Sequence, residues 1–394
     1  MHPRHILLLA AISAALFGLT ATAAQAQYVE TTLQGLGGTG SMANAINASG
    51  RIVGTSGTTG NTASDAALWS AAHPTTPTAL NGVGGNQSEA LAINAAGQIV
   101  GRSYTTGNTE YDAVLWSAAH PTTPTVLTGL SGIYTYSAAN GINASGQIVG
   151  VSQSTAGPYD AVLWSAAHPT APTVLAGLGG TYSKANGINA SGQIVGVSDT
   201  AGNAAGYTTQ DAVLWSAAHP ITTPTVLTGL GGTGSAALAI NASGHIVGWS
   251  DTTTNVGFDA VLWSAAHPTT PTVLTGLGGI ESAAVAINAS GQIVGYSSTP
   301  GSELDAVLWS ATGGVTDLNT FLGAGWSNTE ATGINDAADI VGYGIYNGSD
   351  AAFLLTPVPE PGALLLLGSG LGALAMMPRS RQGRRRCVSP SQEA

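Results

Sequence analysis

The sequence contains few charged residues, and basic residues are almost absent outside its two ends. Asp, Glu, Lys and Arg make up 7% of the 394 residues, against roughly 25% in an average soluble domain. Residues 28–357 contain 18 acidic residues and three basic ones, Arg51, Arg102 and Lys184, which leaves a net charge of −15. A segment this acidic repels phosphate backbones and anionic lipid surfaces. We therefore expect no nucleic-acid partner.

Cysteine is represented by Cys387 alone, beyond the last arginine of the chain. Residues 1–386 cannot form a disulfide, so their stability must come from packing. We expect no nucleophilic role for Cys387. The sequence also lacks a nucleophile triad, a paired acid and base, a phosphate-binding loop and a cluster of metal ligands, and a repeat with one lysine has little means of tuning pKa values. These absences predict a protein that is not an enzyme and uses no cofactor or metal.

The sequence does contain a unit that is repeated about every 47 residues. Six tryptophans follow this period, namely Trp69, Trp116, Trp164, Trp215, Trp263 and Trp309. Ile-Asn pairs recur independently with the same period, and their asparagines are Asn47, Asn94, Asn143, Asn189, Asn241, Asn288 and Asn335. Two markers with one period indicate that most of the chain is built from one structural unit.

Each unit is predicted to form four short strands, which in one copy are residues 183–189, 193–198, 211–216 and 225–230. An Asn-Ala-Ser-Gly turn separates the first two strands, and a proline-rich turn separates the last two. A four-stranded unit of this length is typical of a propeller blade. Strands that are apolar on both faces also fit sheets that are covered on both sides by neighbouring sheets.

Counting the strands predicts how the ring closes. Three strand types occur seven times, and the fourth type does so only if residues 31–36 are included. We therefore predict an all-β fold for residues 28–357, a seven-bladed β-propeller in which residues 29–36 pair with residues 351–356. This closure removes the exposed sheet edges of an open array.

The repeat resembles the bacterial probable extracellular repeat of the HAF type. The matching pieces in one copy are Gly177–Gly180, Ile188–Gly192 and Asp211–Trp215, and the resemblance extends over nearly all of residues 33–355. This sequence has Asp-Ala-Val where the family has His-Ala-Phe, so nothing that depends on that histidine is carried over. The resemblance implies an exported protein and assigns no catalytic residues.

The N-terminal end has the organisation of a secretory signal peptide. Arg4 precedes an apolar run from Ile6 to Leu19, and Ala24-Gln25-Ala26 supplies the small residues of a cleavage site. Residues 1–26 are therefore predicted to direct export through the Sec machinery, with cleavage after Ala26. An uncleaved N-terminal anchor is the alternative.

The C-terminal end combines Pro359-Glu360-Pro361 with an apolar stretch from Gly362 to Met377 and a basic cluster. The cluster consists of Arg379, Arg381, Arg384, Arg385 and Arg386. The stretch is near the lower length limit for a transmembrane helix, and the arginines predict that its C-terminal end stays in the cytoplasm. Residues 387–394 would then be a short cytoplasmic tail. A plain tail anchor is the alternative interpretation.

Residues 358–386 resemble the PEP-CTERM sorting signal of Gram-negative bacteria that make exopolysaccharide. Pro359, Glu360 and Pro361 match the signature positions of that signal. The resemblance implies that an exosortase processes the tail, and that the protein is anchored transiently in the inner membrane before it reaches the cell envelope or the medium. The segment 387–394 is a departure, because many family members end at the arginines.

Three repeated residue types are candidates for binding. An aspartate ring, for which we favour turn capping over calcium binding, consists of Asp65, Asp112, Asp160, Asp211, Asp259 and Asp305. Histidines that are expected to lie too far apart for one metal are His73, His120, His168, His219 and His267. Asn-Ala-Ser triplets, for which we favour a turn over a glycosylation site, begin at Asn47, Asn143, Asn189, Asn241 and Asn288.

The tryptophans are expected at the interfaces between blades, and an exposed ring that stacks on sugars is the alternative. The favoured function is a structural surface or exopolysaccharide-matrix protein. The second is a carbohydrate-binding propeller, which an exposed Trp or Tyr at a repeated rim position would support. A third, a propeller hydrolase, would need a blade with clustered Asp, Glu or His. The sequence does not identify the ligand, because the rim residues are expected to be nearly identical between blades.

Overall fold

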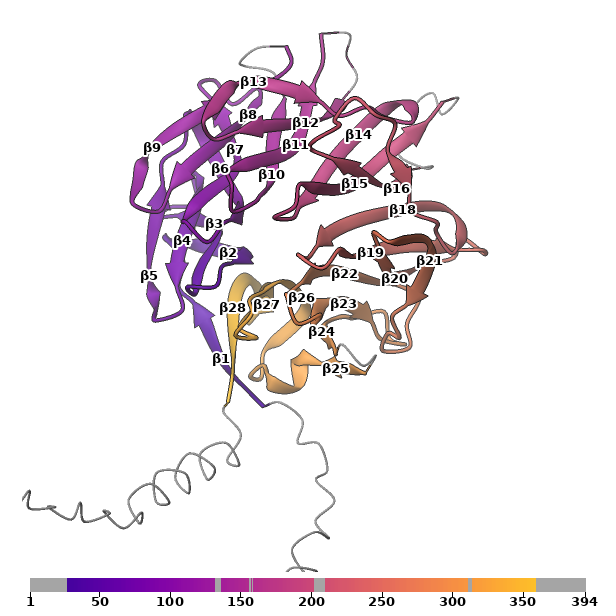
Figure 1. Ribbon diagram of the computed structural model, residues 1–394. Helices are drawn as coiled ribbons and strands as arrows, with labels where there is room; N and C mark the ends of the chain where they lie inside the picture. Colours follow the sequence, from indigo (N-terminus) through magenta and orange to yellow (C-terminus); the bar gives the residue numbers. More distant parts are fainter. Residues whose placement is uncertain are drawn as a thin grey trace, which may run out of the picture. The chain divides into compact units, whose positions relative to one another are not determined.

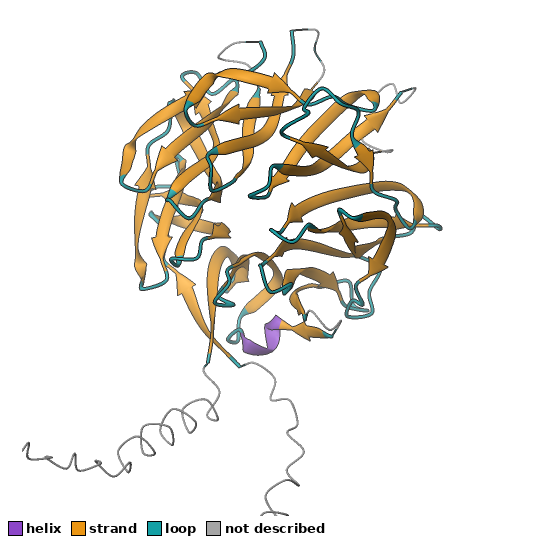
Figure 2. Cartoon of the chain, in the orientation of Figure 1, coloured by secondary structure: helices purple, strands orange, loops and turns teal. Residues whose placement is uncertain are grey.

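The computed structural model describes residues 27–131, 136–155, 157, 159–201, 210–310 and 314–358. These residues form 28 strands and one short 3-10 helix, η1 (Leu318–Phe321), so the prediction of an all-β fold is confirmed (Figure 2). Residues Tyr28–Pro357 form one compact unit. No helix of the described residues has the length and hydrophobicity needed to span a bilayer.

Strand pairing joins the described strands into three sheets of four strands and two of eight. Each eight-stranded sheet consists of two groups of four that are joined by one parallel residue pair, between β4 and β6 or between β12 and β14. We number the seven groups of four in chain order and call them sheets 1 to 7. The first strands are β2 (Gly37–Ile46), β6 (Gly84–Ile93), β10 (Ser137–Ile142), β14 (Gly179–Ile188), β18 (Gly231–Ile240), β22 (Ser282–Ile287) and β26 (Trp326–Ile334). The second strands are β3 (Arg51–Thr58), β7 (Gln98–Thr105), β11 (Gln147–Gln153), β15 (Gln193–Thr200), β19 (His245–Thr252), β23 (Ile293–Ser298) and β27 (Ile340–Tyr346).

The outer half of each sheet follows the same order. The third strands are β4 (Ser64–Ser70), β8 (Tyr111–Ser117), β12 (Tyr159–Ser165), β16 (Gln210–Ser216), β20 (Phe258–Ser264), β24 (Leu304–Trp309) and β28 (Ser349–Pro357). The fourth strands are β5 (His73–Leu80), β9 (His120–Leu127), β13 (His168–Val174), β17 (Thr225–Val226), β21 (His267–Val273), β25 (Val315–Asp317) and, from the N-terminal end, β1 (Tyr28–Leu33). The sheets follow one another around a ring, with the first strands innermost (Figure 1).

The proline-rich segments differ from the prediction. We expected turns, and sheet 4 has a turn there, but in sheet 1 the residues His73–Leu80 form the edge strand β5 with Pro74 and Pro77 inside it. An outermost strand tolerates proline because one of its edges needs no ladder hydrogen bonds. The same prolines blunt that edge against pairing with another chain.

The two ends of the ring are joined by antiparallel pairing of β1 with β28. The register runs from Tyr28 opposite Pro357 to Leu33 opposite Ala352. The predicted closing pair is therefore confirmed, although β1 ends at Leu33 rather than Leu36. Leu33 is buried against the hydrophobic core between sheets 7 and 1.

The seven asparagines of the Ile-Asn pairs link each sheet to the next. Each is buried, and its Nδ2 donates to the main-chain oxygen of the corresponding asparagine one sheet further on, at 3.0 to 3.3 Å. The last of these bonds runs from Asn335 back to Asn47. The acceptor oxygen is used locally, since Asn189 Oδ1 accepts from the backbone amides of Ser191 and Gln193. The turn interpretation of the Asn-Ala-Ser triplets is confirmed.

The six repeat tryptophans fill the interfaces between sheets, as expected, and are 0–3% exposed. Each indole Nε1 donates at 2.7 to 2.8 Å to a carbonyl oxygen that follows the fourth strand of the preceding sheet. Burial of the rings excludes these tryptophans as a sugar-stacking surface. In sheet 7 a leucine takes the place of the tryptophan: Leu355 pairs with Ile340, as Trp69 pairs with Ile52 in sheet 1.

Several sequence predictions fall outside the described residues. They are the signal peptide 1–26 with Ala24 and Ala26, the motif Pro359–Pro361, the apolar helix, the arginine cluster and Cys387. These stay predictions.

The closing pair makes β1 essential for stability. Deletion of residues 28–33 from the full chain is expected to lower the free energy of unfolding by at least about 3 kcal/mol, because loss of one buried leucine alone costs about 2–5 kcal/mol. Deletion of the six residues 389–394 is the matched control. Thermal unfolding followed by circular dichroism measures both, and equal melting temperatures for the two deletions would contradict the closure.

Candidate functional site

The seven sheets differ from one another at one pair of facing positions, of which one lies in the first strand and the other in the second strand. Within the second strand the residue after Ile-Val-Gly or its equivalent is Thr55, Arg102, Val151, Val197, Trp249, Tyr296 or Tyr343. Its partner in the first strand is Met42, Glu89, Ala138, Lys184, Ala236, Ala283 or Glu330. These positions lie within the first and second strands and differ from sheet to sheet, whereas the residues that hold the sheets together are constant.

A row of five tyrosines crosses sheets 2, 3 and 4 beside these positions. Tyr104 stacks on Tyr111 with ring centroids 3.8 Å apart, and successive centroid distances to Tyr136, Tyr159 and Tyr182 are 6.3, 5.3 and 6.2 Å. All five side chains are partly exposed. Tyr111 and Tyr159 occupy the same position of the repeat, one residue before its aspartate.

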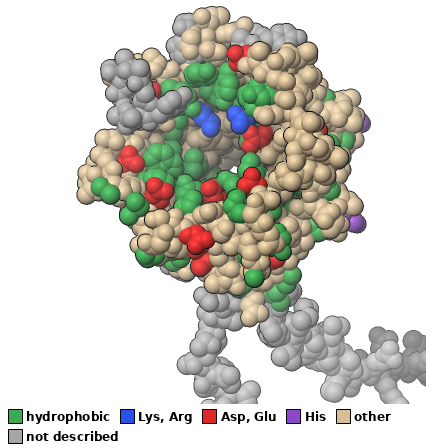
Figure 3. Space-filling model, turned by 180° about the vertical axis from the view of Figure 1, so that it is seen from behind, with side chains coloured by type: hydrophobic (Ala, Val, Ile, Leu, Met, Phe, Trp, Pro, Cys, Tyr) green, Lys and Arg blue, Asp and Glu red, His purple; other side chains and the backbone are tan. Residues whose placement is uncertain are grey.

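The row borders a cavity of about 320 Å³. Tyr136, Tyr159 and Tyr182 contribute aromatic rings to its wall, and Arg102 and Lys184 contribute cationic groups. Figure 3 shows basic side chains on one side of a central hollow and acidic side chains at several other points around it. A cavity with aromatic walls and a few polar groups is the usual form of a small-molecule site.

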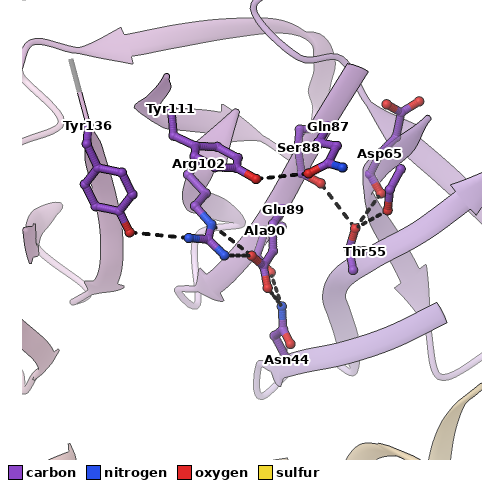
Figure 4. A network of polar contacts seen from close by, with 11 residues as sticks. Asn44, Thr55, Asp65, Gln87, Ser88, Glu89, Ala90, Arg102, Tyr111 and Tyr136 are labelled. Atoms are coloured by element: carbon purple, nitrogen blue, oxygen red, sulfur yellow. Dashed lines mark hydrogen bonds and ion pairs between the residues drawn. The ribbon is translucent and has the colours of Figure 1, made fainter. Parts of the chain in front are cut away.

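Arg102 is held in place by neighbours on two sheets. Its Nε and Nη2 donate to Glu89 Oε2 at 3.0 and 2.8 Å, and its Nη1 donates to the Tyr136 hydroxyl at 3.4 Å. The guanidinium carbon lies 4.8 Å from the centroid of the Tyr111 ring, a cation–π contact. Figure 4 shows Arg102 between Glu89 and Tyr136. The charge of Arg102 is thus largely balanced by Glu89.

Lys184 lies on the same cavity without such a partner. The ion pair between Arg102 and Glu89 is the one found among the described residues, so the Lys184 ammonium has no described carboxylate within 4.0 Å. Burial lowers the pKa of Lys184, the nearby charge of Arg102 lowers it further, and Glu89 acts in the opposite direction. The fold therefore holds an unpaired amine in a site that disfavours its charge.

Sheets 5 and 7 have a different character. The Tyr343 hydroxyl donates to Glu330 Oε2 at 2.9 Å, and burial raises the pKa of Glu330. Trp249 and Phe258 pack together in sheet 5, with ring centroids 5.3 Å apart. Glu330 of sheet 7 thus stands at the position that Lys184 occupies in sheet 4, and Trp249 of sheet 5 at the position of Arg102 in sheet 2.

The predicted aspartate ring is placed differently from the expectation. These aspartates lie within the third strands, where Asp65 pairs with Ser56 and Asp211 with Ser198, so the prediction that each caps a turn is wrong. Burial raises the pKa of both carboxyls. The described residues contain no group of three or more His, Cys, Asp or Glu side chains placed to hold a metal. The repeated histidines are exposed, and four of the five begin outer strands.

Asp305 departs furthest from its usual titration among these aspartates. Burial raises the pKa of Asp305 to about 6, and the charges of Asp317 and Glu303 contribute further. Asn319 Nδ2 donates to Asp305 Oδ1, and Thr329 donates to Asn319 Oδ1. A repeat with one lysine can therefore hold a carboxyl with a strongly raised pKa, contrary to the expectation from the sequence.

Comparison with known proteins gave matches among solved structures, whereas no family model and no curated protein matches the chain. The BP39L lectin from Burkholderia pseudomallei is 11% identical with a TM-score of 0.44, over 84% of this chain and 98% of the lectin. A gluconolactonase from Xanthomonas campestris is 10% identical with a TM-score of 0.39, over 70% and 91%. Trypanosoma rangeli sialidase is 10% identical with a TM-score of 0.39, over 89% and 60%.

These similarities are too distant to assign a ligand or a reaction to this chain. They do correct one prediction, namely that the chain is not an enzyme. The matched structures include the gluconolactonase, the sialidase and the dipeptidyl peptidase 4 of Porphyromonas gingivalis. The absence of a catalytic motif from the sequence is therefore not a sufficient reason to exclude catalysis, and we withdraw that prediction.

Proposed function

We propose that the protein binds carbohydrate in the cavity beside the tyrosine row. The observation that carries this proposal is the convergence of Tyr136, Tyr159 and Tyr182 from two adjacent sheets on one cavity that also contains cationic groups. Tyrosine offers a rigid apolar face together with a hydroxyl group. Sugar rings present the same combination, apolar C–H faces with hydroxyl groups at their edges.

We also propose that the seven sheets are the blades of a seven-bladed β-propeller. The circle of asparagine hydrogen bonds that returns from Asn335 to Asn47 supports this proposal, as does the pairing of β1 with β28. In this architecture the inner strands of several blades meet around one axis. Residues from different repeats can then contribute to one binding site.

Export and sorting form a separate proposal, which is supported by the sequence of the two ends. We propose that the Sec machinery exports the chain, that residues 362–377 anchor it transiently in the inner membrane, and that an exosortase processes it at Pro359-Glu360-Pro361. The mature protein would then lie in the cell envelope or the exopolysaccharide outside the cell. A carbohydrate site suits that location.

Tyr159 is the residue whose loss tests the carbohydrate site. Tyr159→Ser is expected to weaken binding of the tightest oligosaccharide in a panel of neutral and acidic sugars at least about fivefold, because an aromatic contact contributes roughly 1 kcal/mol beyond its burial. Titration calorimetry of the full chain measures the affinity. Phe258→Ser, at the same position of the repeat in sheet 5, is the matched control and should bind as the unaltered chain does.

Two results would contradict this assignment. One is the absence of binding to every sugar in the panel. The other is an equal loss of affinity in the Tyr159 and Phe258 variants, which would indicate a general effect on the fold rather than a contact with the ligand.

The sorting proposal is tested in the native host. Replacement of Pro359, Glu360 and Pro361 by alanine is expected to leave the protein in the membrane fraction with its C-terminal tail intact, because the processing signal is lost. Fractionation and intact-mass measurement check this outcome. Unchanged release of a shortened protein would show that the motif is not required.

A further inference from the structure

We propose that the cavity selects sugars that carry a carboxylate, and that Lys184 is the residue that binds this carboxylate. This inference rests on the proposed carbohydrate site and names the class of sugar that the site prefers. Uronic acids, which carry one carboxylate per ring, are the class that fits.

The first argument is the position of Lys184. It is the single lysine of the chain, and it stands on the inner strand β14 where four other sheets have Met42, Ala138, Ala236 or Ala283. The fold does not require a cation at this position of the first strand, because four other sheets have an uncharged residue at the equivalent position. The side chain of Lys184 lines the cavity together with Tyr136, Tyr159 and Tyr182.

The second argument is the absence of a described partner for the charge. Partial burial of an ammonium group costs free energy unless an anion or a hydrogen-bond acceptor compensates for the lost water. Glu89 is occupied, since its Oε2 accepts two hydrogen bonds from Arg102 and its Oε1 accepts one from Asn44 at 3.3 Å. An anionic group that enters the cavity would compensate the Lys184 charge and form a charge-assisted hydrogen bond.

The third argument concerns the amount of charge. Arg102 and Glu89 balance each other, so Lys184 leaves about one net positive charge on the cavity wall. One carboxylate matches this charge. A polyphosphate or a nucleic acid would bring several negative charges toward a segment in which 18 acidic residues oppose three basic ones, and repulsion would disfavour it.

The fourth argument is the geometry of the aromatic side chains. The ring of Tyr159 lies between those of Tyr136 and Tyr182, at centroid distances of 5.3 and 6.2 Å, so the wall extends over more than one ring. A sugar that packs against this wall would place its ring substituents near the Lys184 side chain, which lines the same cavity. The tyrosines then supply affinity for the sugar ring, and Lys184 distinguishes an acidic from a neutral substituent.

The test compares two ligands that differ in the carboxylate alone. The probes are the disaccharide galacturonosyl-α-1,4-galactose, which carries one carboxylate, and the neutral disaccharide obtained by reduction of that carboxyl group, each titrated into the full chain by calorimetry. The unaltered protein is expected to bind the acidic form about tenfold more tightly, which corresponds to about 1.4 kcal/mol, because a hydrogen bond to a charged group is stronger than one to a neutral group. Lys184→Met is expected to reduce this preference to less than about threefold.

Two further variants complete the comparison. Arg51→Met removes one positive charge at a position outside the cavity lining and is expected to keep the tenfold preference. Lys184→Arg retains the charge and is expected to keep most of the preference, which separates loss of charge from disturbance of the fold. Melting temperatures of all variants are measured alongside.

The outcomes distinguish the two proposals. If the unaltered protein binds both probes equally, or if Lys184→Met keeps the full preference, the role of Lys184 is overturned while the carbohydrate site stands. Loss of the preference in both Lys184→Met and Lys184→Arg also overturns it. If neither probe binds and no other sugar does, the carbohydrate site fails as well.

Discussion

The hydrogen bond from each repeat asparagine to the next one is the interaction on which the rest of the structure depends. One side chain performs two tasks, since its oxygen fixes the turn between the first and second strands and its Nδ2 fixes the distance to the neighbouring sheet. Because the side chain is buried, a missing partner would leave polar groups without hydrogen bonds, at a cost of about 1–3 kcal/mol each. All seven asparagines have an acceptor only if Asn335 of the last sheet donates to Asn47 of the first sheet. The pairing of β1 with β28 holds these two sheets together and so allows this hydrogen bond.

A scaffold fixed in this way leaves a few positions free to differ. In sheet 2 a side chain at Gly101 would place its Cβ 1.9 Å from the carbonyl oxygen of Glu89, so the close approach of the first two strands requires glycine there. The residue that follows, Arg102, is thereby held in a fixed position beside Glu89. The corresponding residue in other sheets is apolar, aromatic or hydroxylated. Differences at such positions place Arg102 and Lys184 in sheets 2 and 4, and Glu330 with Tyr343 in sheet 7.

The repeat period, the four-strand unit and the closing pair were predictable from the sequence because they depend on local patterns that recur. The edge strands that contain Pro74 and Pro77 were not, because tolerance of proline depends on being outermost in a sheet. The candidate site was missed for a related reason. Tyr111 and Tyr159 share a repeat position, but Tyr136 and Tyr182 belong to another, and only the ring brings them together. Alignment of the repeats position by position would have shown the variable pair that includes Lys184.

The central claim, that the tyrosine row and Lys184 form the binding site, is tested most directly by amide hydrogen exchange of the full chain with and without the disaccharide galacturonosyl-α-1,4-galactose. The account predicts slower exchange in peptides that contain the cavity segments of β7, β10, β12 and β14, with little change in sheets 5 and 6. The described surface also has a hollow beside His245 and Thr272 in sheet 5 and Ser290 in sheet 6. Protection confined to that hollow, or no protection anywhere, would contradict the account.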